Sequence, residues 1–268
     1  MAFIEVEKDV QLYYEEKGQG RPIIFIHGVW MSSRFFTRQL PYFSEKYRTI
    51  LLDLRSHGQS THVHNGNTVS VYAKDLHAFI DKQGLKDVIL VGWSMGAFVV
   101  WDYLKQFGED NVHSIVIVDE LASDFKWPDF DIGAFDIDTL ITFMTEIQTN
   151  RSLFLQGFLT SMFKDELSAG DVNWMLEEVT KMPASIASAI LFDQSIVDYR
   201  DFLPEITVPT LLCFGRHEKV IPVAAGVHLE KNIPNSELVI FEDSCHCPFI
   251  EESGLFNKTV DAFIQKVL

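Results

Sequence analysis

Short apolar runs alternate with longer amphipathic stretches along most of the chain, which is the pattern of strands followed by helices. Helical spacing of apolar positions predicts helices near residues 33–46, 69–83, 97–107, 223–231 and 254–267. Strand-like runs lie at residues 3–6, 11–16, 23–26, 49–52, 88–91, 115–118, 210–214 and 237–241. The first two runs alternate apolar with polar residues and predict a hairpin, whereas most later runs are continuous Val, Ile and Leu. We therefore predict an α/β fold with a mostly parallel, eight-stranded sheet covered by helices on both faces.

The region 122–203 breaks this alternation, because it contains no convincing strand and its apolar residues recur at helical spacing. Leu140, Phe143 and Ile147 illustrate that spacing. We predict a helical cap at 122–203, inserted into a core domain made of residues 1–121 and 204–268. The predicted cap carries 14 acidic and five basic residues, so we expect it to disfavour strongly anionic substrates. It is also rich in large aromatic residues, and we expect a minority of them to line a pocket.

A small-residue motif stands between the predicted strand 88–91 and the helix after it. The sequence there is Gly92-Trp93-Ser94-Met95-Gly96, a G-x-S-x-G pattern in strand–turn–helix context. A serine at such a turn is raised above the sheet in a strained conformation, and its neighbours at ±2 must be small. The motif therefore predicts Ser94 as a nucleophile, to be followed along the chain by an acid and a histidine.

The histidine and the acid are assigned from chain order and loop position. His246 lies between the last predicted strand and the closing helix, in a loop at the edge of the sheet where Ser94 lies. We predict His246 as the catalytic base. For the acid we prefer Glu218, three residues after Gly215 at the end of a strand, and keep Asp119 as the alternative. Glutamate reaches about 1.5 Å further than aspartate, so its loop must be set back.

Two backbone amides are needed to bind an oxyanion. Met95 follows the nucleophile directly and supplies the first amide. Gly28 allows a sharp bend after strand 23–26, so we predict that Val29 supplies the second. Trp30 and Trp93 are predicted to contact the substrate.

With these residues in place, the chain resembles the α/β-hydrolase superfamily along nearly its whole length. The matching marks are His27-Gly28, the D-x-R-x-x-G-x-S loop at residues 53–60, the G-x-S-x-G motif, residues 215–218 and His246. The resemblance is to the capped carboxylesterase and cofactor-free haloperoxidase-like branch, and it implies that the D-x-R loop is structural. Two positions depart from the family pattern. Glu218 stands where Asp is usual, as in some acyl-homoserine lactone lactonases of this fold, and Cys245 stands where Gly often precedes the histidine.

The nucleophile type and the cysteine pattern narrow the chemistry. Ser94 cannot replace the carboxylate nucleophile of haloalkane dehalogenases and epoxide hydrolases, which form an ester intermediate. Cys245, His246 and Cys247 are adjacent, and neighbouring side chains diverge too much for a tetrahedral metal site. We therefore expect no metal and no cofactor.

Composition excludes several classes of partner and location. The net charge of −16 argues against nucleic acid and anionic membrane surfaces. No window approaches the roughly 18 uninterrupted apolar residues of a membrane span, and the charged first ten residues do not form a secretory signal. Three cysteines cannot form a disulfide framework, so we expect a cytoplasmic protein.

The predicted function is hydrolysis of neutral short-to-medium acyl or aryl esters by a Ser94–His246–Glu218 triad through an acyl-enzyme. Two alternatives stay open at this point. One is hydrolysis of acyl-homoserine lactones, which Glu218 supports, and the other is a ligand sensor that keeps the hydrolase fold and pocket. All three readings predict a small-molecule partner.

Overall fold

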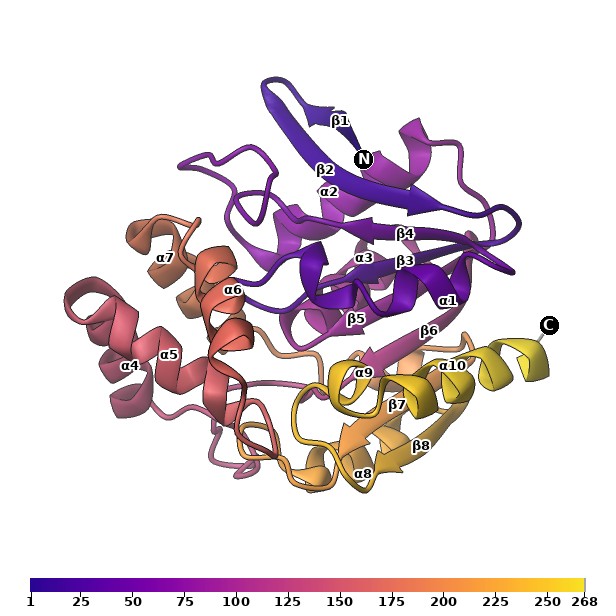
Figure 1. The fold of residues 1–268 in the computed structure, drawn as a ribbon. Helices are drawn as coiled ribbons and strands as arrows, with labels where there is room; N and C mark the ends of the chain where they lie inside the picture. Colours follow the sequence, from indigo (N-terminus) through magenta and orange to yellow (C-terminus); the bar gives the residue numbers. More distant parts are fainter. Residues whose placement is uncertain (268) are drawn as a thin grey trace.

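An eight-stranded sheet forms the centre of the molecule in the computed structural model, which describes residues 1–267 (Figure 1). Its strands are β1 (Ala2–Glu7), β2 (Val10–Lys17), β3 (Pro22–Ile26), β4 (Arg48–Leu52), β5 (Val88–Trp93), β6 (Val112–Val118), β7 (Thr210–Gly215) and β8 (Ser236–Phe241). The spatial order is β1-β2-β4-β3-β5-β6-β7-β8. The β1–β2 and β2–β4 pairs are antiparallel and all other pairs are parallel. The predicted mostly parallel, eight-stranded sheet is confirmed.

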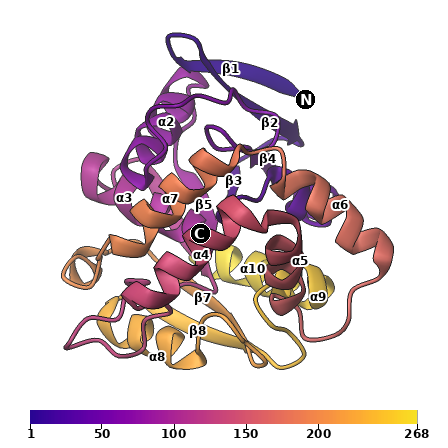
Figure 2. The same cartoon turned by 90° about the vertical axis from the view of Figure 1, so that its left-hand side faces the viewer.

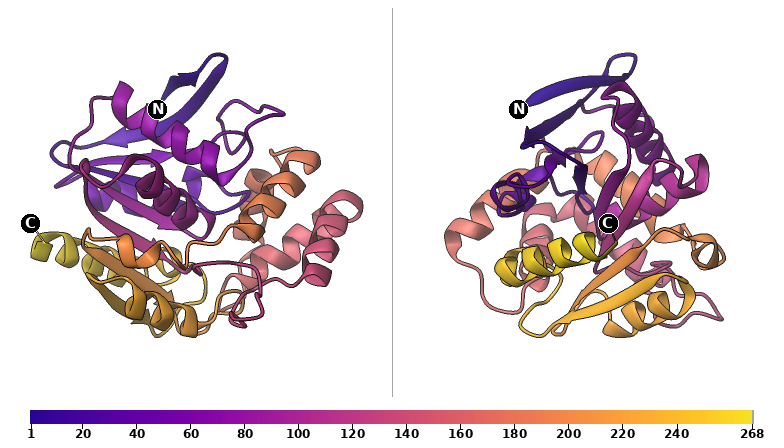
Figure 3. Two further views of the ribbon diagram at one scale, coloured as in Figure 1. Left: turned by 180° about the vertical axis from the view of Figure 1, so that it is seen from behind. Right: turned by 90° about the vertical axis from the view of Figure 1, so that its right-hand side faces the viewer.

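Helices cover both faces of this sheet. One face carries α2 (Val69–Lys82), α3 (Met95–Phe107) and α8 (Val223–Asn232), as the view from behind shows (Figure 3). The other face carries the 3₁₀ turn η1 (Ser33–Phe36) with α1 (Gln39–Phe43), α9 (Pro248–Glu251) and α10 (Ser253–Val267). Strand residues are therefore apolar on both faces, and β3, β5 and β7 are buried along their whole length.

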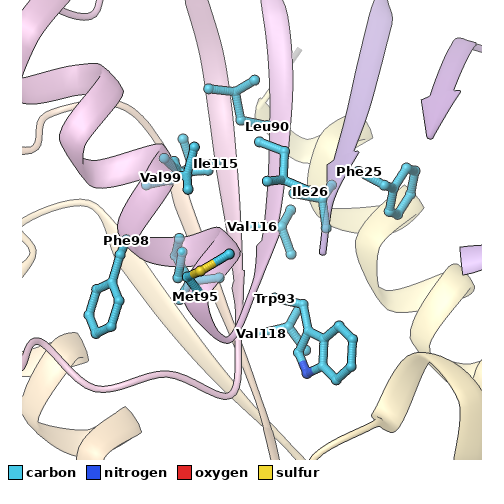
Figure 4. Close-up of a cluster of buried hydrophobic side chains, with 14 of the residues drawn as sticks. Phe25, Ile26, Leu90, Trp93, Met95, Phe98, Val99, Ile115, Val116 and Val118 are labelled. Carbon is cyan, nitrogen blue, oxygen red and sulfur yellow. The ribbon is translucent and has the colours of Figure 1, made fainter. Parts of the chain in front are cut away.

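The core continues through the sheet from one helical layer to the other (Figure 4). Phe98 and Val99 of α3 lie on one side of the strands, and Phe25 and Trp93 lie on the opposite side. Trp93 packs edge-on against Phe249 of α9. This packing fixes the end of β5 between two layers, which is where the predicted nucleophile follows.

Four further helices separate β6 from β7 in the chain: α4 (Ile137–Thr149), α5 (Arg151–Ser161), α6 (Ala169–Val179) and α7 (Ala184–Ile196). They lie across the carboxyl ends of the parallel strands, as seen when the molecule is viewed from that side (Figure 2). We call them the α4–α7 layer. A second 3₁₀ turn, η2 (Leu203–Glu205), leads from this layer back toward β7. The boundaries 122 and 203 of the predicted cap stay a prediction.

Polar contacts join the α4–α7 layer to the sheet domain. Glu178 of α6 is buried and accepts hydrogen bonds from Ser32 Oγ at 2.8 Å and from Arg34 at 3.1 Å. Its pKa is lowered, because hydrogen bonds from Lys181, Ser32 and Arg34 outweigh the effect of burial. None of the helices within residues 1–267 combines the length and apolar character needed to cross a membrane.

Candidate active site

Ser94 occupies a sharp turn between β5 and α3. Its backbone has φ 53° and ψ −131°, a conformation that residues other than glycine rarely adopt. The turn depends on two glycines, since a Cβ on Gly92 would lie 2.5 Å from the carbonyl oxygen of Gly96. A Cβ on Gly96 would lie 2.3 Å from the carbonyl oxygen of Ile26. Strand and helix therefore cross almost in contact, as the motif requires.

His246 lies in the loop after β8 and is 2 % exposed. Its Nδ1 is 2.7 Å from Glu218 Oε2, and the Glu218 side chain is 1 % exposed. A carboxylate accepts, so Nδ1 carries the proton and Nε2 is left as the basic nitrogen. His246 and Ser94 line the same cavity. The structure thus brings together the three residues of the predicted triad.

The second oxygen of Glu218 is held by the backbone. Oε1 accepts hydrogen bonds from the amides of Lys219 and Val220, both at 2.7 Å. Burial favours the neutral acid, but the nearby His246 and these hydrogen bonds outweigh it, so the pKa of Glu218 is lowered. The carboxylate is therefore ionised and cannot rotate without losing both amides.

Asp119, the alternative acid, lies behind Glu218. It follows β6 with φ 43°, and its Oδ1 accepts from the Gly215 amide at 3.1 Å. Burial, followed by the charge of Glu218, raises the pKa of Asp119 well above its usual value. Asp119, Glu218 and His246 place ligand-type atoms within 4.8 Å of one another. The 2.7 Å contact between Nδ1 and Oε2 is that of a hydrogen bond, and is shorter than the separation of two ligands around one zinc ion.

Val29, the predicted second oxyanion donor, lies in a turn that packs against Ser94. The Met31 amide donates to the Gly28 carbonyl at 3.2 Å, and Trp30 has φ 65° at the third position of this turn. A Cβ on Gly28 would lie 3.0 Å from Ser94 Cβ and 3.4 Å from its Oγ. Within residues 1–267 the Val29 amide donates to no other group. The Met95 amide, at the first position of α3, has no intrahelical acceptor.

The two predicted substrate-contacting tryptophans have different surroundings. Trp30 lines the cavity, packs edge-on against Phe158, and donates its indole N–H to the Ala187 carbonyl at 3.0 Å. Trp93 is completely buried, and its indole N–H donates to the backbone carbonyl of His246 at 2.9 Å. Trp93 lines a small cavity of about 10 Å³ beside Ser94, and its indole N–H holds the histidine loop.

The histidine loop is also held by the α4–α7 layer. The His246 amide donates to the Met162 carbonyl at 3.0 Å, and Lys219 Nζ donates to the Phe163 carbonyl at 2.6 Å. Cys245 Sγ lies 3.7 Å from Glu218 Oε1. Burial, followed by the charge of Glu218, raises the pKa of Cys245 to about 12. The cysteine at the family's usual glycine position is therefore a neutral packing residue.

A network of hydrogen bonds involving His27 and Asp53 supports the turn that contains Val29. His27 Nε2 accepts from the Leu54 amide at 3.0 Å and its Nδ1 lies 2.8 Å from the Gly28 carbonyl, which defines a neutral tautomer. Burial lowers the pKa of His27 to about 4. Asp53 accepts from the amides of Ser33 and Gln59, both at 2.7 Å. The D-x-R loop thus ties the turn at residues 28–31 to η1.

The cavity at Ser94 is small, about 30 Å³. Its wall is mostly apolar and includes Phe135, which precedes α4, and Phe143, Phe158 and Leu191 of the α4–α7 layer. Sequence reasoning missed three polar residues in this wall, namely Glu120, Asp124 and Gln194. The signal for Glu120 was present, because it follows Asp119 at the carboxyl end of a buried strand.

Comparisons with known proteins agree with this architecture. The sequence model of the α/β-hydrolase fold family matches residues 21–138 and 178–253. The AB hydrolase superfamily protein YisY of Bacillus subtilis (strain 168) is 30% identical over 267 residues, covering 97% of this chain and 98% of that protein.

Two solved structures superpose over almost the whole chain. They are the esterase EaEST from Exiguobacterium antarcticum (TM-score 0.94, 26% identity, 98% of each chain) and a bromoperoxidase from Bacillus anthracis (TM-score 0.94, 26% identity, 98% of this chain and 99% of that one). The sheet order, the strained serine turn and these matches together show that the chain belongs to the α/β-hydrolase fold family.

Proposed function

We propose that this protein is a serine hydrolase of neutral carboxylic esters with short-to-medium acyl or aryl groups. The observation that carries the proposal is the arrangement of Ser94, His246 and Glu218. A serine in a strained turn lines the same small cavity as a histidine, and Nδ1 of that histidine lies 2.7 Å from a buried carboxylate. The esterase and bromoperoxidase relatives support a hydrolase of this branch.

The proposed reaction proceeds through an acyl-enzyme. His246 Nε2 takes the proton of Ser94 as its oxygen bonds to the ester carbonyl carbon, and Glu218 stabilises the imidazolium. The Val29 and Met95 amides bind the oxyanion, each contributing roughly 3 kcal/mol to the barrier reduction. His246 then protonates the leaving alcohol. Water, deprotonated by His246, attacks the acyl carbon and releases the acid and Ser94.

Two features of the cavity favour short, uncharged substrates. A volume of about 30 Å³ holds one or two water molecules, so Phe143, Phe158 or the layer that carries them must move to admit an acyl chain. The wall contains two acidic side chains and, among residues 1–267, no lysine or arginine. A carboxylate on the substrate would meet an uncompensated negative charge.

The test is a panel of p-nitrophenyl esters of increasing acyl length, measured beside acyl-homoserine lactones. We expect the highest kcat/KM for acetate or butyrate esters, complete loss of turnover in Ser94→Ala, and fluorophosphonate labelling of Ser94 in the wild type. A clear lactone preference would move the assignment to lactone hydrolysis. Absence of turnover and labelling, together with tight ligand binding, would make the protein a sensor.

A further inference from the structure

Two buried carboxyl groups and an amide form a polar cluster in the otherwise apolar cavity wall. Glu120 follows β6, Asp124 lies four residues later, and Gln194 belongs to α7. Their exposed fractions are 1 %, 2 % and 4 %. All three line the cavity that also contains Ser94 and His246. The triad makes no use of them, and polar groups this deeply buried are costly unless they are paired.

Protein groups within residues 1–267 satisfy only some of the hydrogen-bonding atoms of this cluster. Gln194 Nε2 donates to Asp124 Oδ2 at 2.9 Å, and the Leu121 amide donates to Glu120 Oε1 at 2.7 Å. Two acceptor atoms, Asp124 Oδ1 and Gln194 Oε1, are buried and have no hydrogen-bond partner within residues 1–267. Both unpaired atoms are acceptors. A group that satisfied them would therefore be a hydrogen-bond donor.

The charge of the cluster also favours a hydrogen-bond donor as its ligand. Burial and then the charge of Asp124 raise the pKa of Glu120 well above its usual value. Burial raises the pKa of Asp124 to about 6, and the hydrogen bonds of Glu120 and Gln194 oppose this. At neutral pH Glu120 therefore holds its proton and Asp124 remains a carboxylate. An anion in an enclosed apolar wall attracts a donor or a cation strongly.

We infer that Glu120, Asp124 and Gln194 form a specificity subsite for a hydroxyl or amino group carried by the substrate. This inference rests on the proposed ester hydrolysis, because the subsite lines the same cavity as the proposed nucleophile, Ser94. It selects short esters in which a donor group lies a few bonds from the scissile carbonyl. It also excludes anionic substrates, because a carboxylate would face Asp124 without a counter-charge.

Isosteric esters test this directly. Methyl 3-methylbutyrate, methyl 3-hydroxybutyrate and methyl 3-aminobutyrate share one skeleton and place a methyl, hydroxyl or amino group at the same carbon. A second pair, propyl acetate and 2-hydroxyethyl acetate, places the donor on the alcohol side. We expect kcat/KM to be at least about tenfold higher for the donor-bearing member of one of these sets. A larger gain for the amino ester than for the hydroxyl ester identifies a cationic ligand.

Variants locate the effect. In Asp124→Asn the amide oxygen keeps the hydrogen bond from Gln194, so an NH₂ group takes the place of the unpaired Oδ1. Gln194→Met removes the other unpaired acceptor, Oε1, at nearly constant volume. Each should reduce the preference to less than about threefold. Asp193→Asn is the matched control, because Asp193 precedes Gln194 on α7, lies outside the cavity wall, and bonds the Val69 amide. It should keep the full preference. Equal rates within every wild-type set, or a preference that survives in both Asp124→Asn and Gln194→Met, would overturn the subsite.

A binding measurement separates this inference from the proposed reaction. The Ser94→Ala protein should bind the preferred donor-bearing ester at least about tenfold more tightly than its methyl isostere by calorimetry. That result would support the subsite even if the wild type hydrolysed no ester, in which case only the proposed function would fail. Equal binding of the two isosteres would reject the subsite while ester turnover still supported the function.

Discussion

Replacing Glu218 by glutamine removes one negative charge and changes almost nothing else in volume. Glu218 Oε1 accepts two backbone N–H groups, from Lys219 and Val220, and Oε2 faces His246 Nδ1. In Glu218→Gln the amide oxygen must stay with the two backbone donors, since an NH₂ group there would face two N–H groups. The NH₂ group then points at Nδ1 and donates to it. This selects the imidazole tautomer with its proton on Nε2, which cannot accept the proton of Ser94.

The size of the effect follows from the geometry. Two unit charges separated by the 2.7 Å between Nδ1 and Oε2 interact by about 6 kcal/mol at an effective dielectric constant of 20. A 10⁴-fold loss of rate corresponds to about 5.5 kcal/mol. The corresponding carboxylate-to-amide change in another serine triad lowers kcat by about 10⁴ through the same wrong tautomer. We therefore expect a loss of about 10³- to 10⁴-fold in kcat/KM.

The assay is hydrolysis of p-nitrophenyl acetate, with urea unfolding to show that the variant is folded. Glu242→Gln is the matched control, because Glu242 is exposed and, within residues 1–267, its side chain pairs with Arg216 alone. It should retain wild-type activity. If Glu218→Gln kept more than a tenth of wild-type kcat/KM while folded, the carboxylate would not be orienting the base, and the reasoning from the paired oxygens would be refuted.

Two predictions concern stability. Ser94→Gly should be more stable than Ser94→Ala by about 1 kcal/mol in urea unfolding, because only glycine relieves the strain of φ 53°; an equal or more stable alanine variant would contradict this. Asp53 has its pKa raised to about 6 by burial, so the folded state binds its proton more tightly than the unfolded state. Its contribution to stability is thus greatest below pH 4 and falls as pH rises through 6. Unfolding free energy relative to Asp53→Asn should decline by up to about 3 kcal/mol across that window, and a flat difference would show that Asp53 is not shifted.

The sheet was predictable from sequence because its strands are buried on both faces. Continuous runs such as residues 88–91 and 210–214 have no polar face, and only a doubly covered strand suits them. Element ends were less accurate where tertiary contacts decide them. The stretch 33–46 was predicted as one amphipathic segment, but it divides into η1 and α1, with Ser32 Oγ accepting from the Arg34 amide at the start of the 3₁₀ turn.

The sequence predicted the candidate triad residues, but it did not predict the polar residues that surround them. Ser94 and His246 could be located because a turn motif and chain order restrict them to one edge of the sheet. The choice between Glu218 and Asp119 needed coordinates, since both follow buried strands and only the loop path decides which one faces Nδ1. Asp124 and Gln194 lie 70 positions apart and meet only through the packing of α7, so no local pattern could pair them.

The Trp93 side chain links the segment that carries Ser94 to the loop that carries His246. Trp93 precedes Ser94, and its indole N–H donates a hydrogen bond to the backbone carbonyl of His246, 153 positions later. A shift of the end of β5 therefore moves the His246 loop together with Ser94. The distance between the Ser94 hydroxyl and the His246 imidazole is thus preserved when neighbouring helices move. Movement of α4 and α7, which make no hydrogen bond to the histidine loop within residues 1–267, can thus admit substrate while Ser94 and His246 stay aligned.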